Sequence, residues 1–282
     1  MTSNLRRLAR DFSWTPNESA IFEPDTGVWL VETRKRDASV YSDDDWDTMD
    51  PLIESSWWFD TRNKIILKTA ESFRISNEIL DVGSGNGFVA RFLASKGYSV
   101  LTVEPSLKGA VLSARKGLSS ICAELHELKL PGDSIPTVSM FDVLEHVEDR
   151  ADVLAEVSRV LMPGGTLLLT LPALNSLWSG FDNEAGHFLR YSKSEIQREL
   201  ESADMSVISS KYFFSLTVAP IFLIRVIPYR LGMGQTTTIA RSIGGPGGIL
   251  GRVAQWFECT AAGKLPFGSS LIVVARKDTG RI

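Results

Sequence analysis

The sequence predicts an α/β fold built on a doubly wound, seven-stranded sheet, and three observations lead to this prediction. From about residue 77 onward, short apolar runs alternate with amphipathic helical patterns, which is typical of a parallel sheet. A glycine-rich turn, residues 83–87, lies directly between an apolar run and a helical pattern. The length of 282 residues suits one such domain with additions at its ends.

Composition and charge limit the classes of function. Hydrophobic residues make up 44% and charged residues 23%, and the net charge of -4 gives no overall attraction to nucleic acid. From Met205 to the end, the chain has nine Lys or Arg and only two acids, Glu258 and Asp278. This excess of positive charge would suit contact with an anionic surface, or would simply form a solvated face. Cys122 and Cys259 lie far apart, so no disulfide framework is expected. The basic first ten residues lack the apolar core of a signal peptide, so we expect a cytoplasmic protein.

Residues 1–50 are expected to form an appendage to a main domain of residues 51–282. Two short apolar runs, 21–22 and 28–31, lie between turn formers and suggest a small hairpin that is separate from the main sheet. The helical pattern of residues 57–70 follows just ahead of the first core strand, where we expect a lid or docking helix.

Strands and helices then alternate along the main domain. Each expected strand is a short apolar run, and each expected helix carries an apolar stripe. Pro163-Gly164-Gly165 is expected to end one helix and to turn the chain into the next strand. The expected strands are 78–82, 99–103, 120–124, 138–143, 166–171, 206–213 and 270–275, and the expected helices are 89–95, 108–116, 151–162 and 193–203.

An apolar and glycine-rich insertion, residues 213–260, separates the last two expected strands. Its first part, Phe213 to Leu231, is strongly apolar, but two prolines and an arginine interrupt it, and a membrane span needs roughly 20 uninterrupted apolar residues. Two interpretations stay open for this part. It packs over a substrate site as a core or lid segment, or it lies in a membrane interface with Arg225 and Arg230 reaching the head groups.

The glycine turn distinguishes between two kinds of nucleotide site. A dinucleotide site would have its third glycine at position 88, which is Phe88 here, whereas this chain has Gly87. The spacing Gly-x-Gly-x-Gly, with Asp81 two residues before it, resembles motif I of the class I methyltransferases that depend on S-adenosylmethionine (SAM). The resemblance implies a Rossmann-like fold that a hairpin-like pair of strands closes, and it implies SAM as the cofactor.

The turn and the strand end that follows it would hold much of SAM. Glu104 ends the second core strand about 20 residues after the turn, where a carboxylate can accept both ribose hydroxyls, as in dinucleotide folds. A surface acid at a strand end is the alternative. Asp81 and four turn residues would lie along the methionyl and ribose parts: Gly83, Ser84, Gly85 and Gly87.

Further cofactor contacts follow from the resemblance. Leu125 and His126 fall where the family's adenine contacts arise, although Asp is commoner there. Residues 141–147 resemble the strand-four signature of a group that includes the ubiquinone-pathway O-methyltransferases, so Phe141 would flank the cofactor. Arg62 would pair with the SAM carboxylate, or would be a surface arginine.

The same stretch of sequence also contains a candidate metal site. Asp142, Glu145 and His146 match the acid-x-x-Glu-His arrangement that some relatives use for a divalent ion. Many relatives keep the Glu-His pair for a helix start and for packing, so we expect no metal.

Residues 186–191 resemble a Gly-His-x-x-Arg-Tyr signature of methyltransferases that are often linked to cell-envelope glycan and lipid-linked sugar pathways. His187 is the candidate general base, because an unperturbed pKa of about 6.5 lets imidazole accept a hydroxyl proton at neutral pH. Its alternative role is to pin the loop by hydrogen bonds. Arg190 would recognise an anionic acceptor or cap Asp182, and Tyr191 completes the expected catalytic set.

The resemblance spans Trp57 to Lys277 and implies a SAM-dependent methyltransferase. We expect O-methylation of a small-molecule, lipid or lipid-linked saccharide acceptor by in-line transfer. We expect no nucleic-acid partner, and peripheral contact with the inner face of the membrane remains an option. The alternatives are a non-catalytic SAM-binding or membrane-docked regulatory subunit, and an NAD-dependent enzyme, which Phe88 disfavours.

Overall fold

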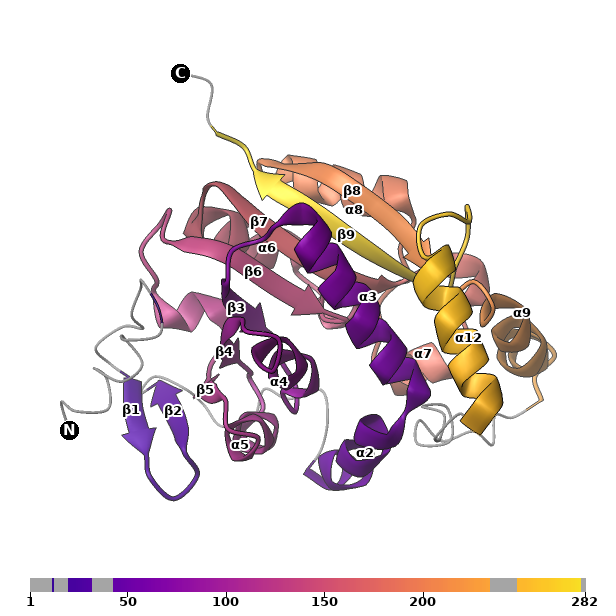
Figure 1. Cartoon of the computed structure of the whole chain (residues 1–282), viewed down its shortest axis with the longest axis horizontal. Coiled ribbons are helices and arrows are strands. Elements are labelled where there is room, and N and C mark those ends of the chain that lie inside the picture. The colour runs from indigo at the N-terminus through magenta and orange to yellow at the C-terminus, as the bar shows by residue number, and fades with distance from the viewer. Residues whose placement is uncertain (1–11, 13–19, 32–42, 234–247, 280–282) are drawn as a thin grey trace.

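The computed structural model describes residue 12 and residues 20–31, 43–233 and 248–279. A single twisted sheet runs through the molecule, with helices on both of its faces (Figure 1). The strand order is β1-β2-β5-β4-β3-β6-β7-β9-β8. The strands are β1 (Ala20–Glu23), β2 (Val28–Val31), β3 (Glu78–Val82), β4 (Ser99–Val103), β5 (Ser119–Cys122), β6 (Ile135–Phe141), β7 (Leu161–Pro172), β8 (Met205–Phe213) and β9 (Ser270–Lys277).

The pairing agrees with the doubly wound sheet that the sequence predicts. The six strands from β2 to β7 pair in parallel in the order β2-β5-β4-β3-β6-β7, whereas β9 runs antiparallel to both β7 and β8. Strand β3 lies at the centre, and both of its faces are buried: Leu80 contributes to one apolar core and Ile79 to the other. Burial on both faces explains why the strand is an almost continuous apolar run.

The N-terminal hairpin was expected outside the main sheet, and this prediction is wrong. Strand β2 pairs in parallel with β5, with Val28 opposite Ser120, so that the sheet has nine strands among the described residues. Trp29 and Val31 are buried in the main core. The hairpin covers the backbone hydrogen-bonding groups of β5, which would otherwise form an exposed edge.

The turn after the third core helix also differs from expectation. Helix α6 (Arg150–Val160) ends before it, but β7 already begins at Leu161, which pairs with Ile135. The register then shifts, and Thr166 pairs with Thr137. The Pro-Gly-Gly segment therefore forms an irregularity inside β7.

Helices cover the two faces of the sheet (Figure 1). Side chains of α3 and α4 pack into one core, while side chains of α6 and α8 pack into the other. The expected boundary at residue 50 falls inside α2. Besides α6, the main helices are α2 (Asp43–Ser55), α3 (Trp57–Phe73), α4 (Phe88–Ala94), α5 (Leu107–Arg115), α7 (Gly180–Glu184) and α8 (Lys193–Ser202).

The described residues of the insertion are mainly helical. Three consecutive segments, α9 (Val218–Ile221), the π-helix η4 (Phe222–Val226) and α10 (Ile227–Arg230), make up its first part, and α12 (Gly248–Ala261) its second. Most of the glycine-rich stretch between them lies outside the described residues. Glu258 of α12 is buried, and its carboxylate accepts hydrogen bonds from the backbone N–H groups of Ser215 (3.1 Å) and Leu216 (2.7 Å). Of the helices described, none is long and apolar enough to cross a membrane.

Gly87 is expected to be the least replaceable glycine of the turn. It has a φ of 73°, and a Cβ placed there would lie 2.5 Å from the Ser113 hydroxyl and 2.8 Å from Leu118. We expect Gly87→Ala to lower the free energy of unfolding by about 1–3 kcal/mol more than Gly117→Ala. Gly117 has a φ of 85°, but a Cβ added there would meet no atom within 4 Å. The loss of stability in Gly117→Ala therefore measures the backbone strain without a steric clash. Urea denaturation measures both, and equal losses would contradict the packing role.

Candidate active site

A cavity of about 1360 Å³ opens at the carboxyl ends of the parallel strands. Gly83 follows β3, Glu104 follows β4 and Asp142 follows β6, and all three line this cavity. Helices α2 and α3 contribute one wall, and the insertion contributes another through α9, η4 and α12. Ligands of doubly wound sheets bind in this position, where loops from several strands converge.

The glycine turn forms the floor of the cavity. Gly83, Ser84 and Gly85 line it, as the sequence predicts, and a Cβ at Gly85 would lie 3.1 Å from the Trp46 ring. Gly87 does not line the cavity; it allows the start of α4 to pack against Ser113. Gly87 therefore supports the turn by close packing and does not border the cavity.

Glu104 is fixed between the turn and the next helix. One carboxylate oxygen accepts a hydrogen bond from the Gly85 N–H at 2.7 Å, and the other accepts one from the Ser106 N–H at 2.8 Å. The side chain is largely buried yet lines the cavity. Both carboxylate oxygens of Glu104 are thus fixed at the border of the cavity.

Asp81 lies below the turn as a buried carboxyl group. The Ser139 hydroxyl donates a hydrogen bond of 2.7 Å to it from the neighbouring strand β6. Burial raises the pKa of Asp81 to about 7, against the opposing effects of the Ser139 hydrogen bond and the Arg62 charge. A group that titrates near neutral pH thus faces the cavity.

Arg62 projects from α3 into the same cavity. Its guanidinium group forms an ion pair with Asp142 and lies over the rings of Trp58 (5.4 Å) and Phe59 (4.9 Å). Its Nε is buried and has no hydrogen-bond partner among the described residues. The arginine is therefore held at the site, which is not the behaviour of a freely solvated surface residue.

The predicted aromatic and adenine contacts occupy the rest of the pocket. Phe141 and Leu125 are buried and line it. His126 lies at the rim, with 68% of its side chain exposed and Nδ1 3.4 Å from the Glu124 carboxylate. All the predicted cofactor-binding residues except Gly87 therefore border one space.

Helix α2 is the part of the site that the sequence did not reveal. Trp46 is buried over Gly85 and also approaches Gly109, where a Cβ would lie 3.3 Å from its ring. Asp50 accepts hydrogen bonds from Asn86 of the turn (2.6 Å) and from Lys116 (2.5 Å). The available signal was the helical spacing of Trp46 and Ile53, which are both buried and both line the cavity.

The loop after β7 brings a histidine to the other end of the cavity. His187 Nδ1 lies 2.9 Å from an Asp182 carboxylate oxygen, and Arg190 Nε donates a 2.7 Å hydrogen bond to the same oxygen. Burial favours a higher pKa for Asp182, but the His187 hydrogen bond and the Arg190 charge outweigh it and lower the pKa. An ionised Asp182 accepts the Nδ1 proton of His187, so that Nε2 carries the lone pair.

The structure separates the three predicted catalytic residues. His187 and Arg190 line the cavity, and Arg190 caps Asp182, which is one of the two roles expected for it. Tyr191 is fully buried in the core, and its hydroxyl donates to Glu199 at 3.2 Å. The expectation that places Tyr191 in the catalytic set is thus corrected. Tyr191 itself forms an isolated parallel bridge with Ala173, and in such an extended segment neighbouring side chains, here Arg190 and Tyr191, point to opposite sides.

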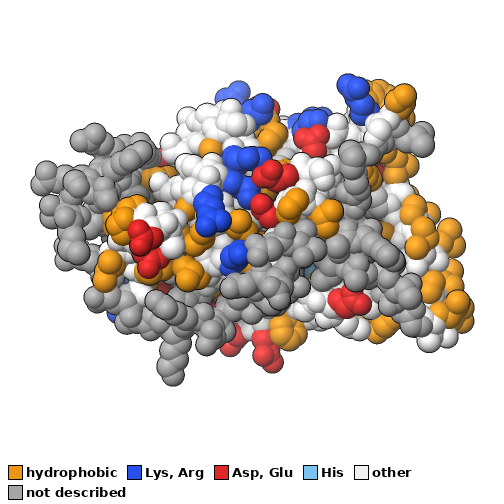
Figure 2. Space-filling view, turned by 90° about the horizontal axis from the view of Figure 1, so that it is seen from below, with side chains coloured by type: hydrophobic (Ala, Val, Ile, Leu, Met, Phe, Trp, Pro, Cys, Tyr) orange, Lys and Arg blue, Asp and Glu red, His pale blue; other side chains and the backbone are white. Residues whose placement is uncertain are grey.

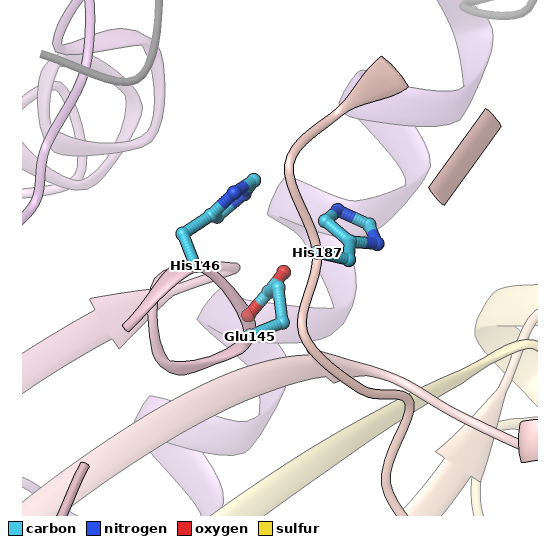
Figure 3. Close-up of side chains that lie close together, drawn as sticks. All are labelled: Glu145, His146 and His187. Atoms are coloured by element: carbon cyan, nitrogen blue, oxygen red, sulfur yellow. The ribbon is translucent and has the colours of Figure 1, made fainter. Parts of the chain in front are cut away.

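Glu145, His146 and His187 form a compact cluster (Figure 3). Their potential ligand atoms lie within 4.8 Å of one another, whereas Asp142, which the sequence pattern includes, pairs with Arg62. Burial, together with the Asp142 charge, raises the pKa of Glu145 well above its usual value. Burial and the His187 charge lower the pKa of His146 to about 4. The cluster has the spacing and donor types of a divalent-cation site.

Comparison with known proteins places these features in a family context. Residues 80–169 match the family model described as a methyltransferase domain. A probable S-adenosylmethionine-dependent methyltransferase of Mycolicibacterium smegmatis is 29% identical over 164 residues, or 57% of this chain and 63% of that protein. A ubiquinone biosynthesis O-methyltransferase of Bradyrhizobium sp. (strain ORS 278) is 34% identical over 109 residues, or 36% of this chain and 42% of that protein. The chain thus spans less than two thirds of the length of these relatives.

Solved structures confirm the fold. The methyltransferase partner of the Haloferax volcanii Trm112 methyltransferase activator has a TM-score of 0.56 at 18% identity, covering 85% of this chain and 97% of that one. A phosphoethanolamine N-methyltransferase 2 of Haemonchus contortus in complex with SAM has a TM-score of 0.54 at 18% identity, covering 86% of this chain and 59% of that one. At this identity the likeness establishes the class I methyltransferase fold and does not assign a substrate.

Proposed function

We propose that this chain, which carries a methyltransferase domain of the class I, SAM-dependent family, binds SAM beside the glycine turn and methylates an oxygen of a bound acceptor. The observation that carries the proposal is that His187, which pairs with the buried Asp182, lines the same cavity as the glycine turn. A nucleotide site and a candidate base thereby share one space, as group transfer between two bound molecules requires.

The cavity residues fit the parts of SAM. The Arg62 guanidinium lines the cavity and its charge suits the methionyl carboxylate, and the Glu104 carboxylate, which also lines the cavity, suits the ribose hydroxyls. Asp81 supplies a carboxyl group for the positively charged end of the molecule. When bound, SAM supplies an electrophilic methyl group on its sulfonium sulfur.

His187 is the residue that would manage the proton. His187 Nε2 would accept the hydroxyl proton of the acceptor, whose oxygen would take the methyl group that bound SAM supplies, with S-adenosylhomocysteine as the leaving group. Asp182 then stabilises the imidazolium through the hydrogen bond at Nδ1, in the way that a buried carboxylate orients a catalytic histidine elsewhere.

The acceptor end of the cavity favours a partly apolar molecule. Phe181, Leu216 and Ile221 line it, and the Arg225 guanidinium lies 4.8 Å from the Phe181 ring centre. Relatives named ubiquinone biosynthesis O-methyltransferase and malonyl-[acyl-carrier protein] O-methyltransferase support transfer to oxygen. We therefore favour a small-molecule, lipid or lipid-linked acceptor with an apolar portion.

Replacing Glu104 tests the cofactor assignment. We expect Glu104→Gln to weaken SAM binding about tenfold or more, because it removes a charged acceptor worth roughly 1.5–3 kcal/mol. The control is Glu71→Gln, on the exposed side of α3, which should bind like the wild type. Calorimetric titration with SAM, S-adenosylhomocysteine and NAD measures the constants. Tight binding of NAD alone, or an unchanged constant in Glu104→Gln, would refute the assignment.

The raised pKa of Asp81 predicts that SAM binds more tightly as the pH rises through about 7. The positive charges of SAM interact favourably with the ionised carboxylate, so binding at lower pH must release the proton that Asp81 holds. A pKa of about 7 in the free protein gives a dissociation constant roughly eightfold larger at about pH 6 than at about pH 7.5. Calorimetry at both pH values should show this change in the wild type and not in Asp81→Asn.

Removing the imidazole of His187 tests the proposed base. We expect His187→Ala to reduce methyl transfer about 100-fold or more while SAM affinity stays unchanged, since general-base catalysis contributes about 10²–10⁴. Transfer of label from methyl-tritiated SAM into a membrane-lipid extract measures the activity. Glu71→Gln, on the exposed side of α3 and outside the cavity lining, is the control. Equal labelling by His187→Ala and the wild type would leave His187 with only a structural role.

A further inference from the structure

We propose that the outer faces of α9, η4, α10 and α12 form a docking surface for an anionic phospholipid membrane. This surface is named the apolar end, and its members are Leu216, Phe222, Leu223, Ile224, Tyr229, Leu231, Met233, Ile249, Val253 and Trp256. This proposed membrane docking is separate from the proposed reaction, and its test does not require catalytic turnover. Figure 2 shows hydrophobic side chains gathered at the right-hand end of the molecule, which carries α9 in Figure 1.

Exposed apolar side chains are concentrated at the apolar end. Of the fourteen large hydrophobic side chains that are exposed in the described part of the chain, these ten belong to the insertion. Leu223 is 62% exposed, Ile224 67% and Trp256 69%. Single exposed hydrophobic residues are ordinary on a soluble protein, but such a concentration marks an interaction surface.

Helix α12 presents these side chains as a stripe. Ile249, Val253 and Trp256 are spaced by four and three residues, so they lie on one side of the helix, and all three are exposed. Other α12 residues point into the protein: Gly251 packs against Trp57, and Glu258 is buried. The helix therefore packs one face on the protein, and the described residues leave its apolar stripe uncovered.

The charge around the apolar end selects an anionic partner. Residues 214–269 contain five Lys or Arg and a single acid, Glu258, which is buried. Arg230, Arg252 and Lys264 are exposed there. Apolar side chains flanked by cations match the pattern of interfacial helices on anionic lipid. In a symmetric dimer this surface would face an identical surface that is also rich in cations, which disfavours a second copy of the chain as the occupant.

The apolar end also adjoins the cavity. Ile221 and Arg225 of the α9–η4 segment line the cavity, whereas Leu223 and Ile224 between them are exposed. On α12, Ala254 lines the cavity beside the exposed Val253. The same short helices thus separate the acceptor site from the proposed lipid surface, where an acceptor with an apolar tail would be concentrated.

Vesicle co-sedimentation of the full chain tests this proposal. We expect the wild type to bind vesicles of phosphatidylcholine with phosphatidylglycerol at least about tenfold more tightly than vesicles of phosphatidylcholine alone, and added salt to weaken the binding. Trp256→Asp and Ile224→Asp should each reduce binding about tenfold or more, and Arg252→Glu should reduce it selectively on the anionic vesicles.

Ile208→Asp is the matched control, because Ile208 is 47% exposed on β8, outside the insertion. It should bind vesicles like the wild type, and S-adenosylhomocysteine titration of every variant reports whether the domain is intact. No binding of the wild type, or equal loss in Ile208→Asp, would overturn the proposal. A dimer in light scattering that Trp256→Asp dissociates, with no vesicle binding, would assign the surface to a second copy instead.

Discussion

The parallel pairing of β3 with β4 and β6 is the constraint on which the site depends. It brings the ends of three strands to one edge of the sheet, so that the glycine turn, Glu104 and Asp142 face one cavity. Hydrogen bonds then lock this edge. Ser139 of β6 donates to Asp81 of β3, and Glu104 connects Gly85 to the start of α5. The turn is therefore held by buried charges as well as by backbone geometry.

The buried carboxyl groups at the site differ in the direction of their pKa shifts. Burial raises the pKa of both Asp81 and Glu145, whereas His187 and Arg190 keep the Asp182 carboxylate ionised despite its burial. All three side chains are almost completely inaccessible to solvent, and Asp182 differs from the other two in the His187 hydrogen bond and the Arg190 charge, which lower its pKa. Pairs of titratable groups whose environments move their pKa values in opposite directions are typical of sites of acid–base chemistry.

The features that could be predicted from the sequence are those that local residue patterns determine. The glycine turn, Glu104 and the seven core strands follow from residue spacing, and the structure contains each of them. Pairing of the hairpin with β5 depends on a distant strand edge, and nothing within residues 20–31 indicates it. Tyr191 sat in a recognisable motif, but the direction of its side chain depends on a bridge to Ala173. Trp46 reaches the turn through tertiary packing of α2, which spacing alone does not reveal.

Helix α3 connects the cofactor end of the cavity with the apolar end. Gln255 of α12 donates hydrogen bonds to Asp60 (2.7 Å) and Thr61 (3.2 Å), the two residues that precede Arg62. A displacement of α12 would therefore act on the helix that positions the Arg62 guanidinium. Because Glu258 of the same helix also holds the start of the α9 segment, α12 contacts both walls of the cavity. The interface between α3 and α12 therefore connects the proposed lipid surface with Arg62, the residue that we propose to contact the cofactor.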